Sequence, residues 1–290
     1  MKKLTPYDID DLQILKDLSK KNSCASSPYL AHEFLIMKQQ YETFNRNNGV
    51  PWLCSSAGIQ AILAEKLEYH YEKQSPKVTF EFIKKIRKEL SPKTCPMCGS
   101  MGVSTVDHYL PRANFPEWTI FSKNLVPACD CNSRRSTTVC GSQPNERVLH
   151  PYFDNALENR LMSCQILGDL QSPNFDIIAL AAPNAHPDMV EFHLNEIVRK
   201  SNIINWLKDT WDGMRAVPSD VIENMEDDEA VTSAQLIVKL NKLLGKYDRR
   251  YKTKNNWSSV FIHGILQNQN AIDWIVNQQN GIINGTIVTG

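Results

Sequence analysis

Two short cysteine pairs in the middle of the chain have the residue types and spacing of a metal site. Cys95 and Cys98 stand in the run Cys-Pro-Met-Cys-Gly, and Cys129 and Cys131 stand in the run Cys-Asp-Cys. Two thiolates three positions apart on a tight turn can reach one Zn²⁺ ion, and the glycine lets the backbone fold back over it. Four thiolates close a tetrahedral structural site. The sequence therefore predicts structural zinc, with disulfide pairing as the alternative.

A set of polar residues lies between and just after these cysteines. An alternating stretch ends in Asp107 and His108 within the run Asp-His-Tyr-Leu-Pro, Asn124 begins the run Asn-Leu-Val-Pro-Ala-Cys, and Asn132 follows the last cysteine. Histidine suits proton transfer because its pKa lies near neutral pH. Carboxylate and amide oxygens suit a hard divalent cation. We therefore expect the chemistry of the chain to reside here.

The order of these pieces resembles the HNH family of endonucleases, also called ββα-metal or His-Me finger nucleases. The matching stretch runs from about Cys95 to Arg135, with a weaker tail through Leu-His-Pro-Tyr-Phe-Asp, which ends at Asp154. The ordered combination C-x-x-C, D-H-x-x-P, N-L-V-P-A-C and C-N is specific, although no single piece is. The resemblance implies a zinc-stapled ββα module, which we place at residues 93–154, and hydrolysis of phosphodiester bonds with a divalent cation.

The resemblance also implies a role for each polar residue. His108 is expected to be the general base that deprotonates the attacking water, and Asn124 to tie the loop that holds this histidine. Asp107 and Asn132 are the expected ligands of a catalytic cation, Mg²⁺ or Mn²⁺. Such a cation stabilises the charge that builds on the leaving oxygen.

Three further residues near the module are candidates for substrate contact or support. Arg134 and Arg135 follow Asn132 and are candidates for contacts with flanking phosphates, with ordinary surface charge as the alternative. His150 either contacts substrate or packs against the module, and its aromatic and proline neighbours favour packing. The other histidines are expected to be core or surface residues: His32, His70, His186, His193 and His263.

The second cysteine pair departs from the family pattern, which usually has C-x-x-C at this place. Deleting one residue rotates the start of the following helix by about 100° at 3.6 residues per turn. Either Cys129 and Cys131 both bind zinc through a tighter loop, or Cys140 replaces one of them. The rotation also makes Ser133 or a water an alternative to Asn132 at the cation. We keep Asn132 because amides ligate hard cations readily.

Helical periodicity on both sides of the module predicts a mainly α protein of the α+β class. We expect an N-terminal helical region at residues 1–92 and a C-terminal, mainly helical region at residues 155–290. Thr5-Pro6 predicts the start of the first helix, and the Gly168-Asp169 turn predicts a small hairpin with residues 161–167. The other expected helices carry the apolar stripes Leu30–Phe44, Ile59–Leu67 with Ile62 inward, Phe82–Leu90, Val190–Val198, Leu236–Tyr247 and a final Phe261–Ile275.

Composition and charge limit the class of protein. The chain has 290 residues, 42% of them hydrophobic, and 32 basic against 32 acidic side chains, as in soluble globular proteins. A net charge of zero argues against nucleic-acid binding through global charge, and we expect the basic clusters at residues 84–93 and 239–254 to be solvated helix faces. There is no apolar run of roughly 20 residues and no apolar signal region, so we expect a cytoplasmic protein with no membrane contact.

These features lead to one leading hypothesis and two alternatives. The leading one is an endonuclease with DNA as the expected substrate and RNA as the open alternative. Because the module does not read base sequence, we expect a regulatory protein partner. The runs quoted above are similar to HNH subunits found beside ATPases in bacterial anti-phage systems of the Septu and retron type, which implies a defence effector restrained by an ATPase. The alternatives are an inactive zinc-stapled module that binds nucleic acid or protein, and a restriction-type nuclease acting alone.

Overall fold

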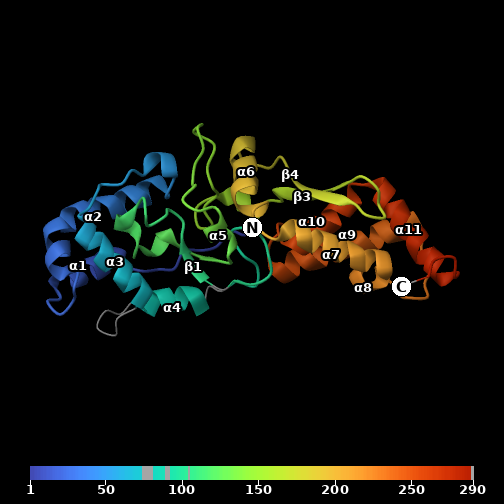
Figure 1. Ribbon diagram of the computed structural model, residues 1–290, viewed down its shortest axis with the longest axis horizontal. Helices are drawn as coiled ribbons and strands as arrows, with labels where there is room; N and C mark the ends of the chain where they lie inside the picture. The colour runs from blue at the N-terminus through green and yellow to red at the C-terminus, as the bar shows by residue number, and fades with distance from the viewer. Residues whose placement is uncertain (74–80, 89–91, 104, 289–290) are drawn as a thin grey trace.

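The computed structural model describes residues 1–73, 81–88, 92–103 and 105–288. The molecule is elongated, with the N-terminal helices at one end, the C-terminal helices at the other and the first strands between them (Figure 1). Helices dominate, and the described residues add two sheets of two antiparallel strands each. The expected α+β class is therefore confirmed.

The N-terminal helices form where apolar residues recur at three and four positions. Leu30, Met37, Tyr41 and Phe44 lie on one buried face, as the stripe predicted. That face packs on the middle of the chain, since the Tyr41 ring centroid lies 4.3 Å from that of Phe121. The helices are α1 (Asp11–Lys20), α2 (Ser27–Asn47), α3 (Ala61–Lys73) and α4 (Glu81–Lys88), with a 3-10 turn η1 (Pro51–Leu53) before α3.

Two predictions for this region were wrong, and one lies outside the described residues. Helix α1 does not begin at Thr5-Pro6, because Asp10 caps it and its side chain accepts a hydrogen bond from the backbone of Gln13. Ile62 is 37% exposed, since its position on α3 turns it away from the buried face. Leu90, the last residue of the fourth stripe, is not among the described residues.

The middle of the chain folds as two strands followed by one helical turn. Strand β1 (Thr105–His108) pairs antiparallel with β2 (Leu125–Ala128), which places His108 opposite Leu125. The connection contains the 3-10 turns η2 (Pro116–Trp118) and η3 (Ser122–Asn124). After β2 the chain turns directly into α5 (Cys131–Arg134).

The C-terminal half begins with the predicted hairpin and continues in helices. Strands β3 (Met162–Leu167) and β4 (Asn174–Ala179) pair antiparallel, which confirms the hairpin. The predicted final helix is two helices, because Asn268 ends the first stretch and its side chain caps the second. The other elements are η4 (Asn155–Glu158), α6 (Pro187–His193), the π-helix η5 (Leu194–Val198), α7 (Ile203–Ala216), α8 (Pro218–Val221), α9 (Ser233–Tyr251), α10 (Trp257–Leu266) and α11 (Gln269–Ile283). None of the described helices has both the length and the apolar composition of a membrane span.

Candidate metal centre and adjoining site

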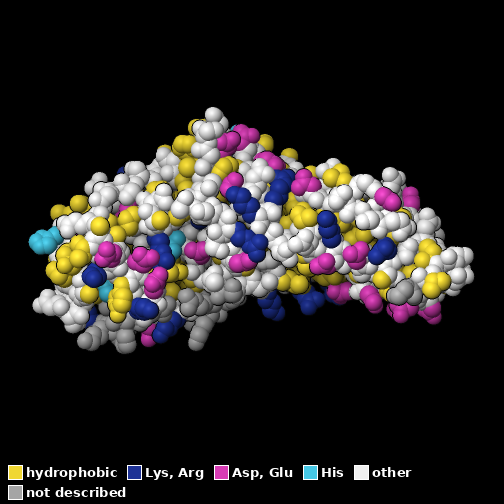
Figure 2. Space-filling view, in the orientation of Figure 1, with side chains coloured by type: hydrophobic (Ala, Val, Ile, Leu, Met, Phe, Trp, Pro, Cys, Tyr) yellow, Lys and Arg dark blue, Asp and Glu magenta, His cyan; other side chains and the backbone are white. Residues whose placement is uncertain are grey.

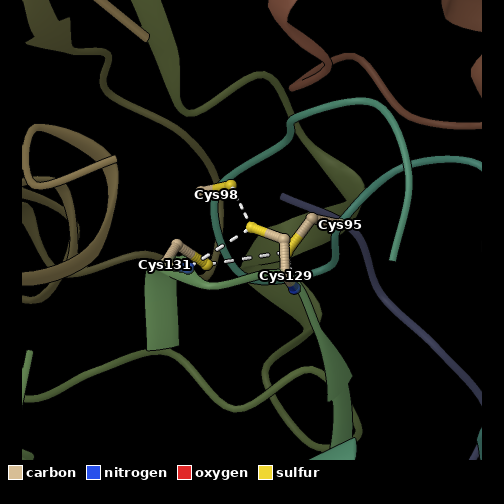
Figure 3. Close-up of side chains that lie close together, drawn as sticks. All are labelled: Cys95, Cys98, Cys129 and Cys131. Carbon is tan, nitrogen blue, oxygen red and sulfur yellow. Dashed lines mark hydrogen bonds between the residues drawn. The ribbon is translucent and has the colours of Figure 1, made fainter. Parts of the chain in front are cut away.

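The four cysteines of the two predicted pairs surround one point (Figure 3). Their Sγ atoms all lie within 4.8 Å of one another, with 3.7 Å between Cys95 and Cys131 and 3.5 Å between Cys98 and Cys129. A tetrahedral zinc site with Zn–S bonds of about 2.3 Å requires sulfur–sulfur distances of about 3.8 Å. The donor set therefore fits Zn²⁺. Cys140 is not part of this group among the described residues, so the tighter C-x-C loop is the alternative that the structure contains.

The structure around Gly99 shows why a glycine follows the first cysteine pair. Its φ is +87°, a left-handed conformation, and a Cβ there would lie 2.1 Å from the backbone oxygen of Asn255. The turn is closed by hydrogen bonds from the amide of Gly99 to the carbonyl of Cys95 and from the amide of Cys95 to that of Ser100. Only glycine satisfies both the conformation and the close approach.

Two residues of the C-terminal half contact this turn, residues 95–100 (the cysteine turn), from outside. Nδ1 of His193 accepts a hydrogen bond from the backbone amide of Leu149, and its Nε2 donates a hydrogen bond to the carbonyl of Met97 at 2.8 Å. Burial lowers the pKa of His193 to about 3, so the ring is neutral. The indole of Trp257 donates to the carbonyl of Cys98 at 3.0 Å. Sequence reasoning assigned no chemistry to His193, because a bond to a distant backbone carbonyl leaves no motif.

Asp107 and His108 lie at the end of β1, next to the metal centre in sequence and fold. The His108 ring is buried, and its Nε2 lies 2.9 Å from the carbonyl oxygen of Thr119. A carbonyl can only accept, so Nε2 carries the proton and Nδ1 keeps a lone pair. Nδ1 lies 3.9 Å from a carboxylate oxygen of Asp107, whose side chain is 33% exposed. Burial lowers the pKa of His108 to about 4, so the ring is neutral at neutral pH.

Asn124 ties together the loop between the two strands. Its Oδ1 accepts the amide of Leu110 at 2.7 Å, and its Nδ2 donates to the carbonyls of Leu110 and Trp118. The carbonyl next to Trp118 is that of Thr119, which holds His108. Asn124 is fully buried and acts on His108 only through this loop.

Asn132 and Arg135 form a buried pair under the end of β1. Asn132 donates from Nδ2 to the carbonyl of His108, and its Oδ1 accepts from Nε of Arg135 at 2.9 Å. The remaining N–H groups of Arg135 point at the carbonyls of His108, Tyr109 and Thr138. Arg135 is only 2% exposed, which contradicts the expected contact with a flanking phosphate. It positions the strand end instead.

Arg134 and His150 lie in opposite surroundings. Arg134 is exposed and forms an ion pair with Asp130 one helical turn earlier. His150 is 1% exposed and packs among aromatic rings, with its ring centroid 4.1 Å from that of Tyr109 and 4.7 Å from that of Phe153. The structure thus supports packing, and not substrate contact, for His150.

Helix α3 covers His108, a feature that sequence reasoning missed. The Tyr71 ring centroid lies 4.5 Å from that of His108, and the Tyr71 hydroxyl donates to the carbonyl of Val106. The guanidinium of Arg112 lies over the Tyr71 ring and pairs with Glu68 and Glu72 of the same helix. A cavity of about 500 Å³ borders this cover and reaches Thr119.

Fold and site together define a mainly helical α+β protein with a four-cysteine metal centre beside a buried histidine. A stretch of 66 residues is 39% identical to protein ea31 of Escherichia phage lambda, and the match covers 22% of this chain and 22% of that protein. No family model and no solved structure matches the chain.

Proposed function

We propose that the chain is a metal-dependent endonuclease of the HNH type that hydrolyses phosphodiester bonds, with DNA as the expected substrate. The observation that carries this proposal is the state of His108. Its Nε2–H is fixed on the carbonyl of Thr119, so the lone pair lies on Nδ1, on the side of Asp107. A neutral imidazole held in one tautomer beside a partly exposed carboxylate is the arrangement that a general base next to a cation requires.

Asp107 and Asn132 would hold the divalent cation. Carboxylate and amide oxygens are the ligands that Mg²⁺ and Mn²⁺ prefer. The Asp107 carboxylate is partly exposed, and Asn132 Oδ1 accepts one hydrogen bond, from Arg135, which leaves a second lone pair. When bound, the cation supplies Lewis-acid stabilisation of the charge on the phosphate and the leaving oxygen.

The residues of the chain then divide the work of proton transfer. Nδ1 of His108 takes the proton of the attacking water, because Nε2 already carries a proton, which it donates to the carbonyl of Thr119. Asn124 fixes the loop that carries the Thr119 carbonyl and therefore the orientation of the ring. Arg135 fixes the carbonyls of His108 and Tyr109 and acts as a positioning residue.

A second candidate, a zinc-stapled binding module without catalysis, is favoured by the burial of the site. His108 is 5% exposed and Asn132 3% exposed, and Tyr71 lies over the His108 ring. The restraining partner expected from the resemblance, an ATPase, stays a prediction.

The test is a cleavage assay with plasmid DNA, single-stranded DNA and total RNA, in buffer with Mg²⁺, with Mn²⁺ or without added divalent cation. We expect cation-dependent cutting by a protein that carries about one zinc per chain. Asp107→Asn should abolish the cutting, whereas Asp209→Asn, a matched change at an exposed aspartate of α7, should not. Cutting that Asp107→Asn leaves intact contradicts the proposal, and bound zinc without any cutting favours the second candidate.

A further inference from the structure

A basic groove of about 460 Å³ lies between the first residues of the chain and the C-terminal end of α9. Figure 2 shows Lys and Arg side chains gathered over the middle of the molecule, near the N-terminus marked in Figure 1. The residues that line the groove are Lys3, Leu157, Glu158, Asp248, Arg249, Lys252, Thr253 and Lys254.

The cations of the groove outnumber its acids. Glu158 also lines the groove, and its charge, with that of Asp154, acts on Lys3. Asp248 is paired with Arg160 at 2.8 Å, so its charge is already neutralised. Arg249, Lys252 and Lys254 are exposed, and none of them takes part in an ion pair with any described residue. Burial lowers the pKa of Lys2, and the positive charge of Lys252 lowers it further.

Another face of α9 behaves differently. Lys239 pairs with Glu229, and Lys246 and Arg250 pair with Glu223, so acidic residues that precede α9 neutralise the basic residues of that face. On the side of the groove, the positive charge of Arg249, Lys252 and Lys254 remains available to an anionic partner.

Lys252 occupies a backbone conformation in which glycine is the usual residue. It ends α9 with φ +53°, and its amide closes the helix on the carbonyls of Asp248 and Arg249. A lysine in this left-handed conformation is less favourable than a glycine. An unfavourable backbone conformation at a residue other than glycine is a reason to look for a function of its side chain.

The groove is attached to the metal centre by backbone contacts. The Thr253 hydroxyl donates to the carbonyl of Met1, and the amide of Lys2 donates to the carbonyl of Pro96 in the cysteine turn. On the other side, the amide of Trp257 donates to the carbonyl of Gly99. Both walls of the groove are thus fixed relative to the four cysteines.

We propose that the basic groove, whose cations are Lys3, Arg249, Lys252 and Lys254, binds the sugar-phosphate backbone of the nucleic acid that the candidate active site cuts. This proposal rests on the proposed function and names the surface that holds the substrate. Successive cations along a groove match successive phosphates, whereas they read no bases. We therefore expect binding that depends strongly on salt and little on sequence, although the chain as a whole is neutral.

The experiment measures binding without cutting, in the full-length chain carrying His108→Ala. The probes are labelled duplex DNA, single-stranded DNA and duplex RNA over a series of salt concentrations. Adding Arg249→Glu and Lys252→Glu together should weaken the tightest complex by about tenfold or more, and should lower the slope of log K against log salt by about 2. Lys242→Glu is the matched control, because Lys242 is an exposed lysine of α9 outside the groove.

Lys252→Gly separates binding from folding. It removes the charge and relieves the left-handed conformation, so the variant should be at least as stable as the parent while its salt slope falls by about 1. Unchanged binding by the groove variants, equal losses in Lys242→Glu, or no binding to any of the three probes overturns the proposal. Poly-glutamate serves as a further probe that stands for an acidic protein partner. Groove variants that lose poly-glutamate binding but keep nucleic-acid binding would also overturn the proposal and would indicate such a partner. If the groove variants lose binding and the wild-type chain cuts none of the substrates, the endonuclease proposal is refuted while the binding surface remains supported.

Discussion

Arg134 and Arg135 are neighbours in the sequence but differ completely in their surroundings. The guanidinium of Arg135 is buried and donates to three backbone carbonyls and to Asn132, whereas Arg134 is exposed. The sequence does not separate the two, because the single turn of α5 gives no periodicity from which to decide which arginine faces inward. Asp107 and His108 could be proposed from the sequence, because their types suit a cation ligand and a base, and the structure places both side chains at the end of β1.

Replacement of each arginine by methionine should show this difference. Arg135→Met leaves several carbonyls without donors and should lower the free energy of unfolding by about 3 kcal/mol. Arg134→Met should leave it nearly unchanged, because the side chain loses only a surface ion pair. Urea unfolding of both variants checks this prediction. Equal effects would mean that Arg135 does not hold the strand end.

His150 makes the stability of the fold depend on pH. Burial lowers its pKa from 6.5 to about 3 in the folded chain. Below pH 6.5 the unfolded chain therefore binds a proton that the folded chain does not, so stability is complete above pH 6.5 and is lost as the pH falls towards 3. Between pH 7.5 and 5.5 the wild type should lose about 1 kcal/mol more than His150→Asn. Parallel stability curves for the two proteins in urea titrations would refute this assignment.

At the scale of elements, the short C-x-C loop lies between strand β2, which pairs with β1, and the single turn of α5. The apolar stripes and the β3–β4 hairpin could be predicted because their periodicity is local. The break between α10 and α11 was missed, since Asn268 acts as a cap only in the folded chain. Whether C-x-C supplies both thiolates could not be settled from spacing, because it depends on how tightly the loop between β2 and α5 turns.

The C-x-C loop gives a direct prediction about zinc. Cys131→Ser should reduce bound zinc well below one per chain or unfold the module, because one of four ligands is lost. Cys140→Ser should keep about one zinc per chain, because Cys140 lies outside the four-cysteine group. Metal analysis of the purified variants decides the matter. Loss of zinc in Cys140→Ser would restore the alternative in which Cys140 is a ligand.

At the scale of the whole molecule, the cysteine turn contacts both the N-terminal end and the C-terminal half of the chain. His193 and Trp257 donate to carbonyls of this turn from the C-terminal half, and Lys2 does so from the N-terminal end. The two helical regions expected from periodicity therefore both contact the turn that carries Cys95 and Cys98. Such contacts could not be predicted from the sequence, because they join distant side chains to backbone carbonyls that any residue can supply.

Removal of zinc should therefore loosen distant helices. Chelation should raise amide hydrogen exchange in α10, which begins at Trp257, and to a smaller extent in α11, which makes no such bond to the turn. Hydrogen exchange followed by mass spectrometry, with and without a chelator, measures this. Exchange confined to residues near the cysteines would show that the metal centre does not support the C-terminal half.

The most direct test of the account is single-turnover cleavage by His108→Ala compared with His32→Ala, at saturating Mn²⁺ and equal zinc content. His32 is an exposed histidine of α2 and serves as the matched control. We predict that His108→Ala lowers the cleavage rate by 10²-fold to 10⁴-fold, the usual contribution of a general base, while His32→Ala cuts like the wild type. Equal rates in all three proteins would contradict the account, because His108 would then not be the base.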